Sequence, residues 1–201
     1  MGRAATTGLS LLCAGTVSCA RSAQPWQTSP LAAMCRVPSA EAVAVTAGSE
    51  YAIFRLLLLR LSDNANTILL VDAARPRGCE YPVASEWITH RDSSLLTPFI
   101  MANLKGLRFT QDSLRVAKRV VLLRHRPRTK EQWALIPSQY DRPSAVIEFS
   151  RVGFSSDGVR AVVEVATQCA WGLCGEVGYF FLASDAAGTW TVIGYKPWGF
   201  S

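Results

Sequence analysis

The sequence lacks any run of apolar residues long enough to cross a bilayer, although 49% of its 201 residues are hydrophobic. A membrane-spanning helix needs about 20 consecutive apolar residues, so a polytopic membrane protein is excluded. The G-x-S-x-G nucleophile motif and the G-x-x-x-x-G-K phosphate loop are also missing. The composition is that of one globular domain without the common signatures of a hydrolase or a nucleotide-binding protein.

Metal-ligand patterns are scarce as well. The chain has two histidines, His90 and His125, and neither lies within a few residues of another histidine or of a cysteine pair. Cys169 and Cys174 have four residues between them, with no second pair at zinc-finger distance. We therefore expect no metal and no cofactor.

Glu148 and Glu164 lie on two strands that are predicted to be neighbours. Two carboxylates on neighbouring strands could act as a general acid and a general base. With Ser155–Gly158 as the connecting loop, Glu164 pairs with Phe149, so Glu148 is expected on the opposite face of the sheet. The two residues are then solvent-facing strand carboxylates and not a catalytic pair, unless a bulge shifts the register.

His90, Asp92 and Ser93 form the best combination of base, orienting acid and nucleophile in the sequence. The same residues are ordinary loop composition, so we name no catalytic residue and expect binding rather than catalysis. The alternative function is a small hydrolase with a pocket between helix and sheet, with His90 as the base and Asp92 as the group that orients it.

Residues 1–20 have the character of a secretory signal peptide. Arg3 is followed by a stretch without charges, and Ser18-Cys19-Ala20 is a small-x-small pattern that suits signal peptidase. Lipoprotein processing at Cys19 is the alternative. We expect a secreted or periplasmic protein.

Removal of the signal peptide leaves four cysteines, an even number that suits an oxidising compartment. We expect a disulfide between Cys169 and Cys174, which would fix the mouth of a hairpin, and one between Cys35 and Cys79. The alternative is four reduced, buried thiols.

Behind the signal peptide, residues 21–39 are predicted to be irregular because prolines are spread through them, and 40–201 are predicted to form one α+β domain. Over Glu50–Leu61, four residues fall on one apolar helical face, namely Phe54, Leu57, Leu58 and Leu61. Further expected elements are strands over Thr67–Asp72 and Arg119–His125 and helices within Ser93–Leu104 and Thr129–Leu135.

The final third of the chain predicts an antiparallel meander. Its four strand-like runs are Val146–Phe154, Val159–Thr167, Val177–Ser184 and Thr189–Tyr195. If the loops close symmetrically, Val163 lies opposite Phe181, which lies opposite Val192, so one face is apolar and has to be covered. The expected fold is α+β, with this four-stranded sheet covered on one face by the N-terminal helices.

Residues 105–130 contain nine basic residues and a single acid, in a chain whose net charge is +6. Alternation along a strand would place Arg124, Arg126 and Arg128 on one face. We assign these three residues and Lys130 to an anion-binding site. The expected partner is an anionic envelope surface or an acidic polysaccharide, and export argues against nucleic acid. The alternative is a solvated rim or a charged sheet edge.

The final third of the chain contains four short motifs, which are Ser-Arg-Val-Gly-Phe at 150–154, Cys-Gly at 174–175, Gly-Tyr at 178–179 and Gly-x-Trp-x-Val at 188–192. Together they resemble the C-terminal part of a group of uncharacterised bacterial exported proteins. The resemblance implies export and a sheet-forming domain. It implies no activity and no catalytic residue.

Overall fold

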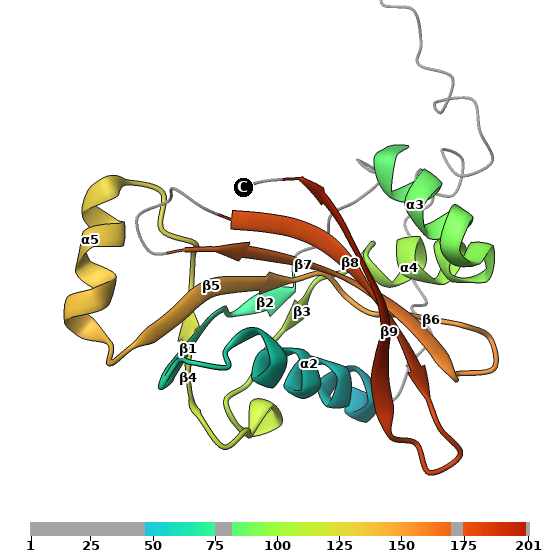
Figure 1. Ribbon diagram of the computed structural model, residues 1–201, viewed down its shortest axis with the longest axis horizontal. Helices are drawn as coiled ribbons and strands as arrows, with labels where there is room; N and C mark the ends of the chain where they lie inside the picture. The colour runs from blue at the N-terminus through green and yellow to red at the C-terminus, as the bar shows by residue number, and fades with distance from the viewer. Residues whose placement is uncertain (1–46, 75–81, 170–174, 200–201) are drawn as a thin grey trace, which may run out of the picture.

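The computed structural model describes residues 47–74, 82–169 and 175–199 (Figure 1). The helices are α2 (Ala47–Leu61), α3 (Pro82–Asp92), α4 (Leu96–Ala102) and α5 (Lys130–Gln139), with 3₁₀ turns η2 (Ser93–Leu95) and η3 (Asp112–Leu114). The strands are β1 (Thr67–Val71), β2 (Ala73–Ala74), β3 (Leu107–Arg108), β4 (Arg119–Leu123), β5 (Pro143–Phe149), β6 (Gly153–Phe154), β7 (Arg160–Gln168), β8 (Gly175–Ser184) and β9 (Trp190–Gly199). Among the described residues, no helix combines the length and the apolar character needed to cross a membrane.

Seven strands form one mixed sheet in the order β4-β1-β5-β7-β8-β9, with β6 paired to β7. β1 runs parallel to both β4 and β5, whereas the pairs β5–β7, β7–β8 and β8–β9 are antiparallel. β4 and β9 are therefore the edge strands of the sheet. The short strands β2 and β3 pair with each other in a separate two-stranded sheet.

The predicted four-stranded meander with helices on one face is wrong. The chain does combine helices and strands in an α+β fold, but β1 and β4 extend the sheet beyond β5, and helices cover both faces. All five residues of β1 are buried, so its sequence has no polar side to show how it packs. α3 was not predicted because Ile88 is the buried residue among its described side chains, which leaves no apolar periodicity to detect.

The register of the C-terminal strands also differs from the prediction by one residue. Val163 pairs with Phe180, and Phe181 pairs with Val162. A shift of one residue moves every side chain of a strand to the other face of the sheet. Tyr179–Leu182 is buried at every position, so the sequence offers no alternation of polar and apolar residues from which to read the register.

One face of the sheet packs against α2. The apolar side of this helix is fully buried and comprises Ile53, Phe54, Leu57 and Leu58. It lies on alternate residues of three strands, which are Ile147, Phe149, Val163, Val165, Phe180 and Leu182. The rings of Phe54 and Phe149 are 4.9 Å apart between centroids. Burial of a side chain of this size contributes about 1.5–3 kcal/mol, so this interface is the main core.

The opposite face carries two smaller cores at its two ends (Figure 1). The segment α3-η2-α4 covers β7 and β8 with a cluster that comprises Ile88, Leu95, Phe99, Val162, Tyr179 and Phe181. The helix α5 covers β1 and β5 with a cluster that comprises Leu69, Val71, Trp133, Ile136 and Val146. Helices thus lie on both sides of the sheet, and α5 and α3 stand at opposite ends of it.

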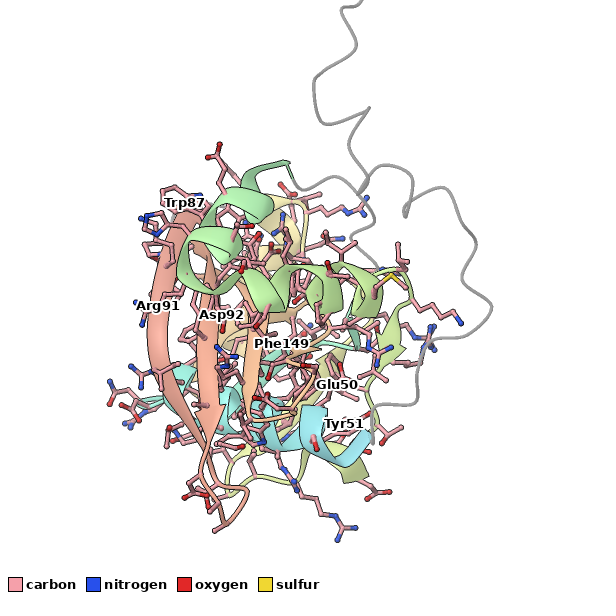
Figure 2. The ribbon with its side chains drawn as sticks, turned by 90° about the vertical axis from the view of Figure 1, so that its right-hand side faces the viewer. Glu50, Tyr51, Trp87, Arg91, Asp92 and Phe149 are labelled. Atoms are coloured by element: carbon pink, nitrogen blue, oxygen red, sulfur yellow. The ribbon has the colours of Figure 1, made fainter. Side chains whose placement is uncertain are left out.

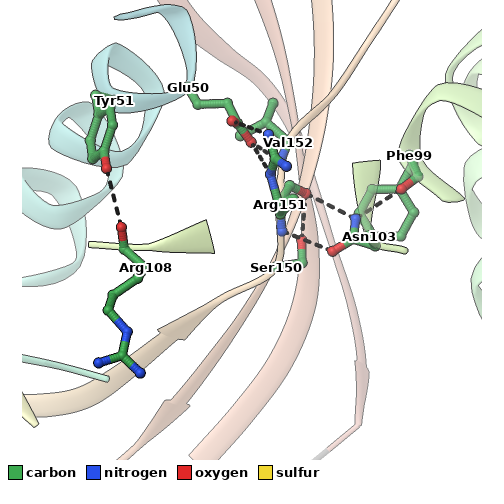
Figure 3. Close-up of polar contacts among 8 residues, drawn as sticks. All are labelled: Glu50, Tyr51, Phe99, Asn103, Arg108, Ser150, Arg151 and Val152. Carbon is green, nitrogen blue, oxygen red and sulfur yellow. Dashed lines mark hydrogen bonds and ion pairs between the residues drawn. The ribbon is translucent and has the colours of Figure 1, made fainter. Parts of the chain in front are cut away.

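A buried ion pair joins α2 to the sheet (Figure 3). Glu50 is 1% exposed, and Arg151 donates to both of its carboxylate oxygens, from Nε at 3.1 Å and from Nη2 at 2.7 Å. The backbone N–H of Val152 donates a third bond to the same carboxylate at 3.0 Å. A buried charge is tolerated when it is both paired and hydrogen-bonded, and Glu50 meets both conditions.

The residues between β5 and β6 form a β-bulge. Phe149 pairs with Val165, and Gly153 pairs with Val162. Three residues, Ser150–Val152, therefore stand opposite two residues of β7. The bulge changes the register between β5 and β7 by one residue relative to the hairpin formed by β6 and β7.

Side chains from α4 and from the bulge itself hold this geometry (Figure 3). Asn103, directly after α4, is fully buried. Its side-chain oxygen accepts from the backbone N–H of Arg151 at 2.8 Å, and its side-chain nitrogen donates to the Arg151 carbonyl at 3.1 Å. The hydroxyl of Ser150 accepts from the backbone N–H of Glu164 at 2.8 Å. The Ser-Arg-Val part of the motif at 150–154 thus has a structural role.

We predict that Glu50→Ala lowers the free energy of unfolding by about 3–5 kcal/mol, because it leaves the Arg151 guanidinium and the Val152 N–H without their buried partner. Urea denaturation measures the change. Asp112→Ala is the matched control, because Asp112 and Arg115 form an exposed ion pair whose loss should cost less than about 1 kcal/mol. Equal losses in the two variants would contradict the role given to Glu50.

We predict that Gly153→Ala is destabilising by about 1–3 kcal/mol, since a Cβ at this position would lie 2.4 Å from the Cα of Phe99 and would push α4 away from the sheet. Gly48→Ala is the control, because a Cβ there meets no atom within 4 Å. Thermal unfolding followed by circular dichroism should show a lower Tm for the first variant alone. A Tm unchanged by Gly153→Ala would refute the close approach of α4 and β6.

Candidate functional site

A pocket opens between the end of β4 and the helix α5. Its volume is about 500 Å³, which is within the usual range of small-molecule sites. The polar residues that line it are His125, Arg126, Arg128, Gln132 and Gln139, and the apolar ones are Leu123, Pro127, Leu135, Ile136 and Tyr140. The pocket therefore combines cationic groups with an apolar wall.

The local sequence explains how the pocket is built. β4 ends at Leu123, and residues 124–128 continue as a loop. Thr129 then caps α5, because its hydroxyl accepts from the backbone N–H of Gln132 at 3.3 Å. The Oε1 atom of Gln132 accepts in return from the backbone N–H groups of Thr129 and Arg128, at 3.4 and 2.7 Å. This capping box holds the end of the arginine-containing loop against the first turn of the helix.

The pocket is electropositive. Its lining contains no carboxylate, and neither Arg126 nor Arg128 forms an ion pair with an acid of the described residues. Outside the lining, Glu131 lies in the first turn of α5, where hydrogen bonds from the backbone and from the Thr129 hydroxyl hold its pKa below the usual range. Guanidinium groups present paired donors that match carboxylate and phosphate oxygens, so the site suits an anion.

The three arginines predicted to share one strand face, Arg124, Arg126 and Arg128, do not lie on a strand. That assignment required a strand through Arg124, Arg126 and Arg128, but β4 stops at Leu123 and the alternation ends with it. Arg126 and Arg128 line the pocket, whereas Arg124 and Lys130 lie outside its lining. The loop conformation, rather than strand alternation, brings the two arginines together.

Other cations of the 105–130 segment have structural contacts. Arg108 lies 3.9 Å from Asp72, and Arg115 lies 3.0 Å from the acid three residues before it. The ammonium group of Lys118 donates to the carbonyls of the two residues that follow α2, where a cation complements the helix dipole. Three of the nine basic residues therefore contact other parts of the protein, and two others, Arg126 and Arg128, line the pocket.

Asp92 is engaged in structural contacts rather than in orienting His90. Its carboxylate accepts from the guanidinium of Arg160 on β7 at 2.6 Å, and from the N–H and hydroxyl of Ser94 at 3.1 and 2.6 Å. Figure 2 shows Asp92 beside the C-terminal strands. His90 is exposed on α3, and α3 lies at the opposite end of the sheet from α5 (Figure 1), the helix that lines the pocket.

Glu148 and Glu164 lie on the same face of the sheet, contrary to the prediction. Glu148 pairs with Ala166, two residues along β7 from Glu164, so both side chains point to the face that α4 and α5 cover. The bulge at Ser150–Val152 and a longer hairpin turn together shift the pairing by one residue. Both glutamates are buried, at 6% and 0% exposure, and the hydroxyl of Tyr179 donates to Glu164 at 3.0 Å. Neither lines the pocket at α5.

The predicted disulfides involve residues beyond those described. Cys169 follows the last residue of β7, which pairs with the first residue of β8. Cys35, Cys79 and Cys174 lie outside the described residues, as does the predicted signal peptide, so these assignments stay predictions. Within 47–74, 82–169 and 175–199 no group of three or more His, Cys, Asp or Glu side chains is placed to hold a metal ion.

Sequence reasoning missed the helical side of the pocket. The residues of α5 that line it recur at i, i+3, i+4 and i+7, and they are Gln132, Leu135, Ile136 and Gln139. Residues with this spacing share one face of a helix. The pair Thr129-x-x-Gln132 is also a recognisable capping box, which could have placed the end of the basic loop against that face.

A scan against protein-family models found no match, and neither did searches of curated proteins and of solved structures. The resemblance to bacterial exported proteins therefore stays a prediction. The proposed function therefore rests on the residues that line the pocket.

We predict that Tyr179→Phe lowers the free energy of unfolding by about 1–3 kcal/mol, because the buried carboxylate of Glu164 loses a hydrogen-bond donor. Tyr51→Phe is the matched control, since the Tyr51 hydroxyl makes an exposed bond of 3.5 Å to the carbonyl of Arg108 and its loss should cost less than about 0.5 kcal/mol. Chemical denaturation of both variants makes the comparison. Similar values for the two variants would argue against a buried Tyr179–Glu164 bond.

Proposed function

We propose that the protein is a non-catalytic binding module that holds an anionic ligand in the pocket between β4 and α5. The observation that carries the proposal is the pair Arg126 and Arg128, which line the pocket without an ion-pair partner among the described acids. Two guanidinium groups at one site can bind a carboxylate or a phosphate through charge-assisted hydrogen bonds. Together with the predicted export, this chemistry fits an anionic molecule of the cell envelope.

Binding is a better interpretation of this pocket than catalysis. A histidine that acts as a base needs a group to orient it and a nucleophile within reach. His125 lines the pocket, but the other lining residues include no carboxylate, serine, threonine or cysteine. The hydrolase alternative placed His90 and Asp92 in its site, and Asp92 is bound to Arg160 and Ser94 instead. No described contact favours the hydrolase.

The proposal predicts that Arg126→Ser combined with Arg128→Ser weakens binding of the chain to immobilised heparin by about tenfold or more, because each charge-assisted hydrogen bond contributes about 1.5–3 kcal/mol. Heparin is a polymer that carries carboxylate and sulfate groups. Because it is too large to enter a deep cavity, it tests the two arginines where they are accessible at the mouth of the pocket. Elution in a salt gradient reports the change. Binding of the unaltered protein and of the variant to heparin should weaken as ionic strength rises.

The matched control is Arg119→Ser combined with Arg124→Ser. These two arginines are exposed, come from the same basic segment and lie outside the pocket lining, so the variant has the same net charge as the pocket variant. We expect it to elute close to the unaltered protein. Equal losses in the two double variants would mean that general charge binds the polyanion, and the proposed site would be wrong.

A further inference from the structure

Half of the residues that line the pocket are apolar. Leu135 is 53% exposed although it is a large aliphatic side chain on a short helix, and it lies beside Ile136, which is 4% exposed. Leu123 and Tyr140, both partly buried, extend this surface from the end of β4 to the end of α5. A contiguous apolar wall next to cationic groups suits a ligand with both kinds of surface.

The cationic groups of the pocket precede α5, whereas the helix itself contributes apolar residues together with the uncharged amides of Gln132 and Gln139. Arg128 precedes the helix and is tied by its backbone N–H to Gln132 in the first turn. Tyr140 follows the last residue of the helix. Gln132 and Tyr140 are eight residues apart, which is about 12 Å along a helix axis. The arginines therefore stand before the N-terminal end of α5, and the apolar residues Leu135, Ile136 and Tyr140 follow toward its C-terminal end.

We infer that the ligand is a single-chain anionic amphiphile, whose head group binds Arg126 and Arg128 and whose alkyl chain lies along Leu135 toward Tyr140. The inference rests on the proposed function and names the ligand class for the same site. A fully buried methylene contributes about fourfold in affinity, from about 0.8 kcal/mol. The alkyl chain would be covered on one side only, by α5 and β4, so we expect each methylene to raise the affinity about twofold.

Isothermal titration calorimetry with butanoate, octanoate, octyl phosphate and octyl glucoside, below their micelle concentrations, tests the inference on the full chain. Octanoate should bind about sixteenfold more tightly than butanoate, because its alkyl chain is four methylenes longer. Octyl phosphate should bind at least as tightly as octanoate, because its head group offers more oxygens to the arginines. Octyl glucoside, which has the chain but no charge, should bind at least tenfold more weakly than octanoate.

Variants at Leu135 and at the two arginines test the contributions of the alkyl chain and of the head group separately. Leu135→Ser should weaken octanoate binding about fivefold and leave butanoate binding unchanged. Leu59→Ser is its matched control, because Leu59 is 40% exposed on α2 and lies outside the pocket. It should change neither affinity. The double change of Arg126 and Arg128 to Ser should remove binding of both anions.

The outcomes distinguish the two proposals. Equal affinities for butanoate and octanoate, both lost in the arginine variant, would overturn the amphiphile and leave anion binding intact. Absence of binding by every anion tested would overturn the proposed function as well. Binding of octyl glucoside as tight as that of octanoate would show a purely apolar site and would also contradict both.

Discussion

The contact between Glu50 and Arg151 is the constraint on which the rest of the structure depends. It joins the first turn of α2 to the bulge between β5 and β6 through two side-chain bonds and one backbone bond. The bulge in turn sets the register between β5 and β7. The position of α2 and the assignment of side chains to the two faces of the sheet are therefore linked through one buried carboxylate. Because an unpaired charge in this setting is costly, alternative registers that separate the two residues are disfavoured.

Most elements of the described fold could be predicted from the sequence, and their arrangement could not. The apolar spacing of Phe54, Leu57 and Leu58 identified the main helix, and all three side chains are buried. The strands of the C-terminal third also lie close to the predicted ranges. The register failed at Tyr179–Leu182, where both faces are covered and alternation disappears. The parallel pairing of β1 with β4 and β5 depends on contacts between distant segments, which leave no local signal.

The candidate site shows a similar division. The concentration of positive charge near Arg126 and Arg128 is visible in the sequence, and both residues line the pocket. Their arrangement was not predictable from strand periodicity, since the chain leaves the sheet at Leu123. The apolar wall comes from a helix that buries Ile136 in the core while Leu135 stays at the surface. Both side chains line the pocket, Ile136 as a member of the buried cluster and Leu135 as an exposed residue.

The position of β4 at the edge of the sheet has a consequence for behaviour in concentrated solution. An edge strand offers free backbone groups to a strand of another molecule. Arg119 opens β4 and Arg124 follows it, and both are exposed. Antiparallel addition of a second copy would bring these like charges together across the new contact, which opposes self-association. Salt screens exposed charges, so a high ionic strength would lower this electrostatic barrier and favour pairing of β4 between two copies.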